Sequence, residues 1–144
     1  MKKAILFFLT CFTLVEADAL IVRESHQDFS HTVEALKQQL TRNHMDVLDV
    51  IDQRAIAHKG SMDINDEQVI MFANPNYNSR MILNDPNVAL ELPMRIAVYR
   101  DYSGKVWIVY RDPIDLKNNY KLSHCGVLPE LHDVLDDVTH GVSK

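Results

Sequence analysis

Three short apolar runs in the middle of the 144-residue chain constrain its fold most strongly. They span Val69–Ala73, Met94–Tyr99 and Val106–Tyr110. β-Branched and aromatic residues fill these runs, and Pro, Asn and Asp residues border them, a pattern that is typical of buried strands. A polar turn that contains Gly104 separates the last two runs. We therefore expect those two runs to form a β-hairpin.

Further strands and helices are predicted on either side of these runs. Short strands are expected at residues 20–22 and 47–51, and helices are expected to begin after Asp28, at Pro75 and near Leu128. The predicted order is β-α-β-β-α-β-β-α. This order favours an α+β fold, with helices packed on a mixed β-sheet of four to five strands.

The N-terminal residues have the pattern of a secretory signal peptide. Two lysines precede an apolar stretch at residues 4–15, and the small residues of Ala17-Asp18-Ala19 then provide a cleavage site. The apolar stretch is too short to anchor the chain in a bilayer. We therefore expect residues 1–19 to be removed and residues 20–144 to form a single α+β domain. That domain would be periplasmic or secreted, without stable membrane insertion after cleavage.

Charge and cysteine content exclude some classes of function. The formal net charge is −5, and no stripe of Lys and Arg offers a surface for phosphates, so the chain is not expected to bind nucleic acid. Of the two cysteines, Cys11 lies in the predicted signal peptide and Cys125 remains. Cys125 follows His124, but neighbouring residues rarely face each other and no third group is evident, so a structural thiol is the favoured interpretation.

The order of sequence motifs is specific enough to suggest a family. The succession VRESHQDFSHTVEALKQQL, VIDQRAIAH, FANPNYNSRMILNDP, LELPMRIAVYRD and GKVWIVYRDP resembles the bacterial and archaeal domain of unknown function 302. The residues that carry the resemblance are Asn74, Pro75, Met81, Leu92, Pro93, Tyr110 and Pro113. Ala73 and Asn78 stand where the family usually has glycine, and Glu91 stands where it usually has aspartate. The resemblance implies an α+β fold, dimers and no agreed activity.

Five residues form a candidate site for a small anionic ligand. A strand that runs into a helix N-terminus leaves backbone N–H groups free, and the positive end of the helix dipole favours an anion. We expect this arrangement at the start of the helix after residue 74. Nearby strand ends would contribute a positive charge, aromatic walls and a carboxylate, so the predicted ligand-binding residues are Asn74, Arg95, Tyr99, Tyr110 and Asp112. The alternative is that Asn74 only caps its own helix.

A second candidate site lies on the last helix. His132, Asp136 and His140 are spaced four residues apart, which places three metal-capable side chains on one helical face. The alternative is a solvated face with a histidine near the helix C-terminus, where the dipole favours positive charge. No cofactor can be named from this pattern.

Two hypotheses about function follow. The first is a non-enzymatic binding or accessory module that forms homodimers. Dimers are expected because both faces of the predicted hairpin are apolar, whereas one layer of helices covers only one face. The second hypothesis is a redox protein that binds haem or a metal through the histidines.

Overall fold

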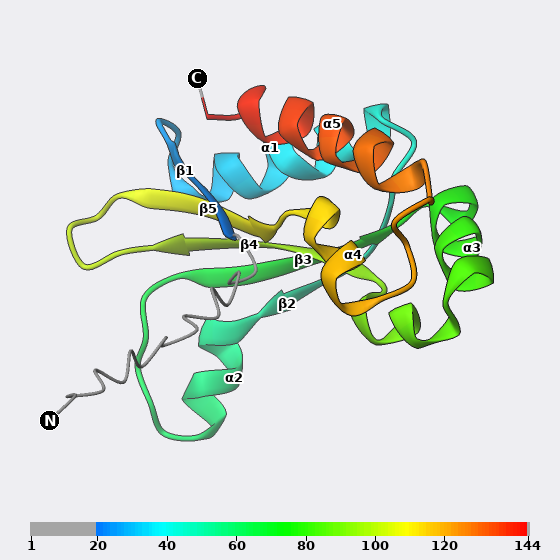
Figure 1. The fold of residues 1–144 in the computed structure, drawn as a ribbon. Helices are drawn as coiled ribbons and strands as arrows, with labels where there is room; N and C mark the ends of the chain where they lie inside the picture. Colours follow the sequence, from blue (N-terminus) through cyan, green and yellow to red (C-terminus); the bar gives the residue numbers. More distant parts are fainter. Residues whose placement is uncertain (1–19, 144) are drawn as a thin grey trace, which may run out of the picture.

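The computed structural model describes residues 20–143, so the predicted signal peptide lies outside the described residues. The described residues form a five-stranded sheet with helices packed on it, shown in Figure 1. The expected α+β class is confirmed. In chain order, the elements are β1 (Leu20–Ser25), α1 (Phe29–Arg42), β2 (Asp46–Asp52), α2 (Gln53–Lys59), β3 (Glu67–Ala73), α3 (Pro75–Asn84), the 3-10 helix η1 (Pro86–Glu91), β4 (Met94–Arg100), β5 (Val106–Arg111), the 3-10 helix η2 (Pro113–Asp115), α4 (Leu116–Asn119) and α5 (Val127–His140).

The strands are arranged in the order β1-β5-β4-β3-β2, and all four neighbouring pairs are antiparallel. A mixed sheet was expected, whereas the observed sheet is antiparallel throughout. The structure shows why the helix α3 between β3 and β4 does not make these strands parallel. Phe72, near the end of β3, pairs with Met94 at the start of β4, so α3 and η1 occupy one end of the sheet. The chain therefore re-enters the sheet from the end at which it left.

Local sequence signals explain where the helices begin and end. The carboxylate of Asp28 accepts a hydrogen bond from the backbone N–H of His31 at 3.0 Å, which caps α1 as expected. Pro75 occupies the first turn of α3. Asp85 has extended backbone angles (φ −148°, ψ 108°) before Pro86, so α3 ends at that point.

One face of the sheet packs against α1 and α5, which lie side by side at the top of Figure 1. Alternate residues of the strands point towards these helices, as the period of two in a strand requires. Side chains from the sheet and the two helices form a buried core that includes Leu36, Leu40, Ile70, Phe72, Ile96, Ile108 and Leu135. This layer gives the sheet a covered face.

The opposite face, which we call the open face, carries a continuous apolar row. In the sheet register, Ile51 pairs with Val69, Val69 with Ala97, Ala97 with Val109, and Val109 with Val22. All five side chains remain at least partly exposed, and the exposed fraction of Val22 is 51%. Both faces of the hairpin are therefore apolar, but α1 and α5 lie on only one of them.

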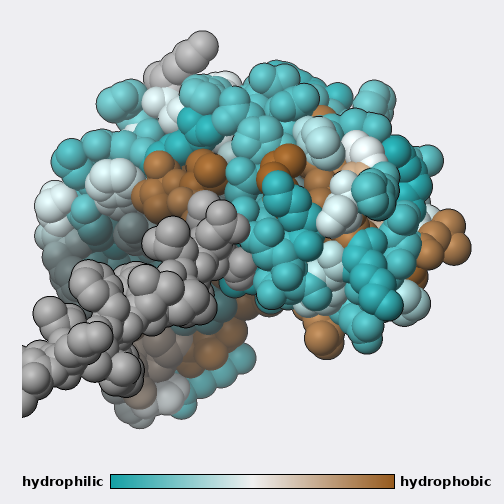
Figure 2. All heavy atoms as spheres, in the orientation of Figure 1, coloured by the Kyte–Doolittle hydropathy of each residue, from teal (hydrophilic) through white to brown (hydrophobic). Residues whose placement is uncertain are grey.

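Apolar side chains also reach the surface elsewhere. Figure 2 shows apolar atoms gathered near β1, over α2, and at the end of the molecule formed by α3. Among the residues that the structure describes, no helix combines the length and apolar character needed to cross a membrane.

Candidate functional site

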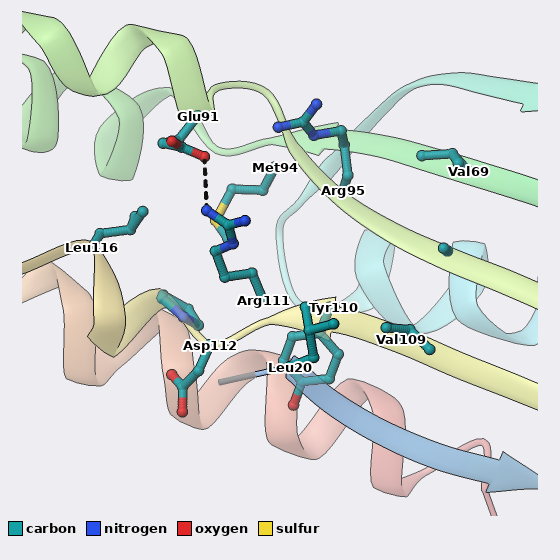
Figure 3. A pocket seen from close by; sticks show the side chains of 12 residues that line it. Leu20, Val69, Glu91, Met94, Arg95, Val109, Tyr110, Arg111, Asp112 and Leu116 are labelled. Atoms are coloured by element: carbon teal, nitrogen blue, oxygen red, sulfur yellow. Dashed lines mark ion pairs between the residues drawn. The ribbon is translucent and has the colours of Figure 1, made fainter. Parts of the chain in front are cut away.

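A hollow of about 340 Å³ opens where β4 begins and β5 ends. Apolar side chains of the open face, among them Val69, Ala97 and Val109, form part of its wall. Charged residues line it as well, and Figure 3 shows them around the opening. These charged residues are Glu91, Arg95, Arg111 and Asp112.

Two arginines are brought together at this hollow. Arg95 and Arg111 lie one position beyond the Ile96–Tyr110 pair, on neighbouring strands. Arg111 Nη1 is 3.8 Å from Glu91 Oε2. Arg95 is exposed, and its side chain makes no hydrogen bond or ion pair with another residue in the range 20–143. Like charges on adjacent strands repel each other, so an anion bound between the two arginines would reduce this repulsion.

Glu91 lies beside Arg111 rather than Arg95. The Tyr120 hydroxyl donates a hydrogen bond to Glu91 Oε1 at 2.9 Å. This bond to a carboxylate, together with burial, raises the pKa of Tyr120. Glu91 is thus held between Tyr120 and Arg111, as Figure 3 shows for the arginine side. Of the charged residues that line the hollow, Arg95 is therefore the one whose side chain has no ion-pair partner among the described residues.

Three of the five predicted ligand-binding residues line the hollow, namely Arg95, Tyr110 and Asp112. The other two lie outside it. Tyr99 is four residues further along β4, opposite Trp107. The Asn74 side chain accepts hydrogen bonds from the N–H groups of two residues in the first turn of α3, and it donates one to His44 O at 2.9 Å. Its amide is therefore engaged in capping and in a backbone contact.

Tyr110 and Asp112 do not face the arginines. Tyr110 lies on the covered face with 2% of its surface exposed, and its hydroxyl has no hydrogen-bond partner among the described residues. Asp112 Oδ1 is 2.9 Å from His132 Nδ1. In Figure 3 the Tyr110 hydroxyl and the Asp112 carboxylate point away from Arg95. The positive groups of the hollow therefore come from Arg95 and Arg111.

The predicted metal-binding residues fall into two groups. His132 is paired with Asp112, whereas His140 Nδ1 lies 3.1 Å from Asp136 Oδ2. Arg23 of β1 contacts both Asp136 and His140, and its Nη1 is 2.9 Å from His140 Nε2. A guanidinium in this position repels cations. Within residues 20–143, no three His, Cys, Asp or Glu side chains converge as metal ligands, and the predicted metal site gains no support from the described geometry.

The His132–Asp112 pair predicts a pH-dependent contribution to stability. The hydrogen bond to Asp112 raises the pKa of His132, although desolvation acts in the opposite direction. A raised pKa in the folded state means that the pair stabilises the fold below about pH 6.5 and loses this contribution as the pH rises through the folded-state pKa. Because the His132 side chain is partly exposed, we expect the pair to add about 0.5 kcal/mol to the free energy of unfolding at low pH.

Urea unfolding of the wild type and of His132→Gln at pH 5.5 and pH 8.5 measures this contribution. The difference between the two proteins should be larger at pH 5.5. A difference that is equal at both pH values, or larger at pH 8.5, would contradict the assigned ion pair.

Sequence reasoning missed Arg111 and Tyr120. A signal for Arg111 was present, because the position of the hairpin turn places it opposite Arg95. The sequence held no such signal for Tyr120. This residue lies in an irregular segment, and its partner Glu91 is 29 residues away in sequence.

The fold and the motifs can now be compared with known proteins. A family model described as "Domain of unknown function DUF302" matches residues 21–138. The chain belongs to the DUF302 family. The crystal structure of an uncharacterized conserved DUF302 protein from Bacillus stearothermophilus is similar to this DUF302 domain, with a TM-score of 0.76 and 16% identity, over 85% of this chain and 97% of that one. At this level of identity the similarity concerns the fold alone.

Curated relatives come from Brucella. Over 103 residues, or 72% of this chain, the DUF302 domain is 27% identical to the protein named "Fluoride-specific ion channel FluC 1" in Brucella suis biovar 1 (strain 1330). A protein of the same name in Brucella abortus biovar 1 (strain 9-941) gives the same identity. The matched segment covers 41% and 38% of these relatives, so the chain spans less than half their length.

Proposed function

We propose that this DUF302 domain is an exported, non-enzymatic binding module that holds a small anionic ligand between Arg95 and Arg111 and acts as a homodimer. The unpaired Arg95 beside Arg111, at the mouth of a hollow, carries the proposal. Export rests on the N-terminal sequence pattern alone.

The chemistry of the two arginines supports an anion as the ligand. A guanidinium presents several N–H donors in one plane, which matches the two oxygens of a carboxylate or the oxygens of a phosphate. Hydrogen bonds to charged groups contribute about 1.5–3 kcal/mol each. The Brucella relatives are named for fluoride, also an anion, and this agrees with an accessory role beside anions.

Titration calorimetry with acetate in low-salt buffer tests anion binding. Loss of one charged hydrogen-bond partner should weaken binding by about tenfold or more in Arg95→Gln. Arg42→Gln is the matched control, because Arg42 is an exposed arginine at the end of α1. Equal binding by the two variants would show that the anion does not bind at Arg95.

The apolar row of the open face supports the homodimer. Its five side chains form a continuous stripe across the whole sheet, and such a stripe is commonly covered by another subunit. Two copies related by a twofold axis could place their open faces together. The ligand hollow would then lie between or beside the two sheets.

Light scattering at micromolar concentration tests this assembly. We expect twice the mass of the chain for the wild type and a shift towards the monomer for Val22→Asp, which places a charge in the exposed part of the row. Leu83→Asp on α3 adds the same charge at a site with 84% exposure and should leave the dimer intact. A monomeric wild type, or a dimer that both variants retain, argues against pairing through the open face.

A further inference from the structure

We infer that the ligand of this hollow is amphipathic: a monocarboxylate whose unbranched apolar chain lies on the open face while its carboxylate contacts Arg95 and Arg111. This inference rests on the proposed anion site and adds the chemical class of the ligand.

The charge at the hollow selects the head group. Glu91 contacts Arg111, whereas the Arg95 side chain has no ion-pair partner among the described residues. One guanidinium without a counter-ion matches a single carboxylate better than a dianionic phosphate. Guanidinium groups from two neighbouring strands could donate to both oxygens of one carboxylate.

The strand geometry places an apolar surface next to the head group. Ala97 lies two residues beyond Arg95 on β4, and Val109 lies two residues before Arg111 on β5. Residues two apart on a strand share a face and are about 7 Å apart. Val69 pairs with Ala97, and Ala97 pairs with Val109, so three apolar side chains stand in one row beside the arginines.

The same three residues line the hollow together with the arginines. A purely polar anion would occupy the arginine end and leave the three apolar side chains inside the hollow without an apolar contact. An alkyl chain would remove apolar surface of both molecules from water, which adds free energy in proportion to the area covered. With about 340 Å³, the hollow lies near the lower end of the volumes typical of small-molecule sites. A medium-chain acid suits this volume.

A chain-length series tests the inference directly. Acetate, butanoate, hexanoate and octanoate are titrated into the full protein by calorimetry, each below its micelle concentration. We expect affinity to rise about two- to fourfold for each added CH₂ group, since the face is only partly enclosed. 1-Octanol, which has the same chain without the charge, should bind at least tenfold more weakly than octanoate.

Variants locate both ends of the ligand. Val109→Thr keeps the β-branched shape but introduces a hydroxyl into the row, so octanoate should bind several-fold more weakly while acetate is unchanged. Ile82→Thr is the control: it also introduces a hydroxyl at a partly exposed apolar position, but on α3 and outside the lining of the hollow, and it should have no such effect. Arg95→Gln should weaken octanoate by about tenfold.

The outcomes separate this inference from the proposed function. If affinity is flat along the series but falls in Arg95→Gln, anion binding stands and the amphipathic ligand is overturned. If none of the acids binds, the proposed anion site itself is wrong. If octanol binds as tightly as octanoate, or Arg95→Gln binds octanoate as well as the wild type, the apolar chain alone is recognised and the inference also fails.

Discussion

Leu36→Ala should lower the free energy of unfolding by about 3 kcal/mol. Leu36 lies on α1 with no exposed surface, in the layer that packs against the sheet and α5. Removing its side chain from this position loses buried apolar surface and leaves a cavity that the neighbouring helix and strands fill only in part. Urea unfolding followed by circular dichroism measures the change.

Leu83→Ala is the control for this result. Leu83 lies on α3 with 84% of its surface exposed, so the same substitution should change stability by less than about 0.5 kcal/mol. Comparable losses in both variants would mean that the layer formed by α1 and α5 is not the main core.

Asp85→Ala should lower the melting temperature by about 5–10 °C. Asp85 is 7% exposed, and its carboxylate accepts hydrogen bonds from Asn87 N and Lys121 N, each at 3.0 Å. The first bond caps η1, and the second ties η1 to the segment that precedes α5. Alanine leaves both N–H groups without this acceptor. Differential scanning calorimetry at pH 7 measures the shift.

The effect of Asp85→Ala should depend on pH in a defined direction. The backbone N–H of Lys121, followed by that of Asn87, lowers the pKa of Asp85 by stabilising its charged form. The carboxylate therefore stabilises the fold at neutral pH and loses this contribution as the pH falls through the lowered pKa. Asp85→Asn, which keeps one oxygen acceptor, should lose less. A difference from wild type that grows in acid would contradict this assignment.

Asp85 also connects stability with the candidate site. The 3-10 helix that it caps ends at Glu91, and Lys121 follows Tyr120. The contact between Glu91 and Tyr120 therefore joins the two segments that Asp85 holds together. Loss of the Asp85 carboxylate should for this reason also loosen the side of the hollow that faces Arg111.

Much of the fold follows from local sequence signals. The caps at Asp28 and Asn74, the proline at the start of α3, and the three apolar runs predicted elements that the structure confirms. The antiparallel direction of β3 and β4 was not predictable in this way. It depends on where α3 and η1 pack, and a sequence pattern does not say whether a connecting helix returns along the sheet or stays at its end.

The candidate site was predictable only in part. The alternation of residues along β5 predicted that Tyr110 shares a face with Val106 and Ile108. The sequence did not show that this is the face covered by the helices. Spacing on α5 correctly indicated that Asp136 and His140 are neighbours. It could not reveal Arg23, which reaches them from β1, 113 residues away from Asp136 in sequence.

A two-dimensional ¹H–¹⁵N NMR titration of the wild type with hexanoate would locate the bound anion residue by residue. Binding at the hollow predicts saturable shifts that are largest for the backbone amides of Arg95, Ala97, Val109 and Arg111, with little change along α1. Shifts that gather instead at the start of α3, around Asn76 and Tyr77, or that rise linearly without saturation, would contradict a site between the two arginines.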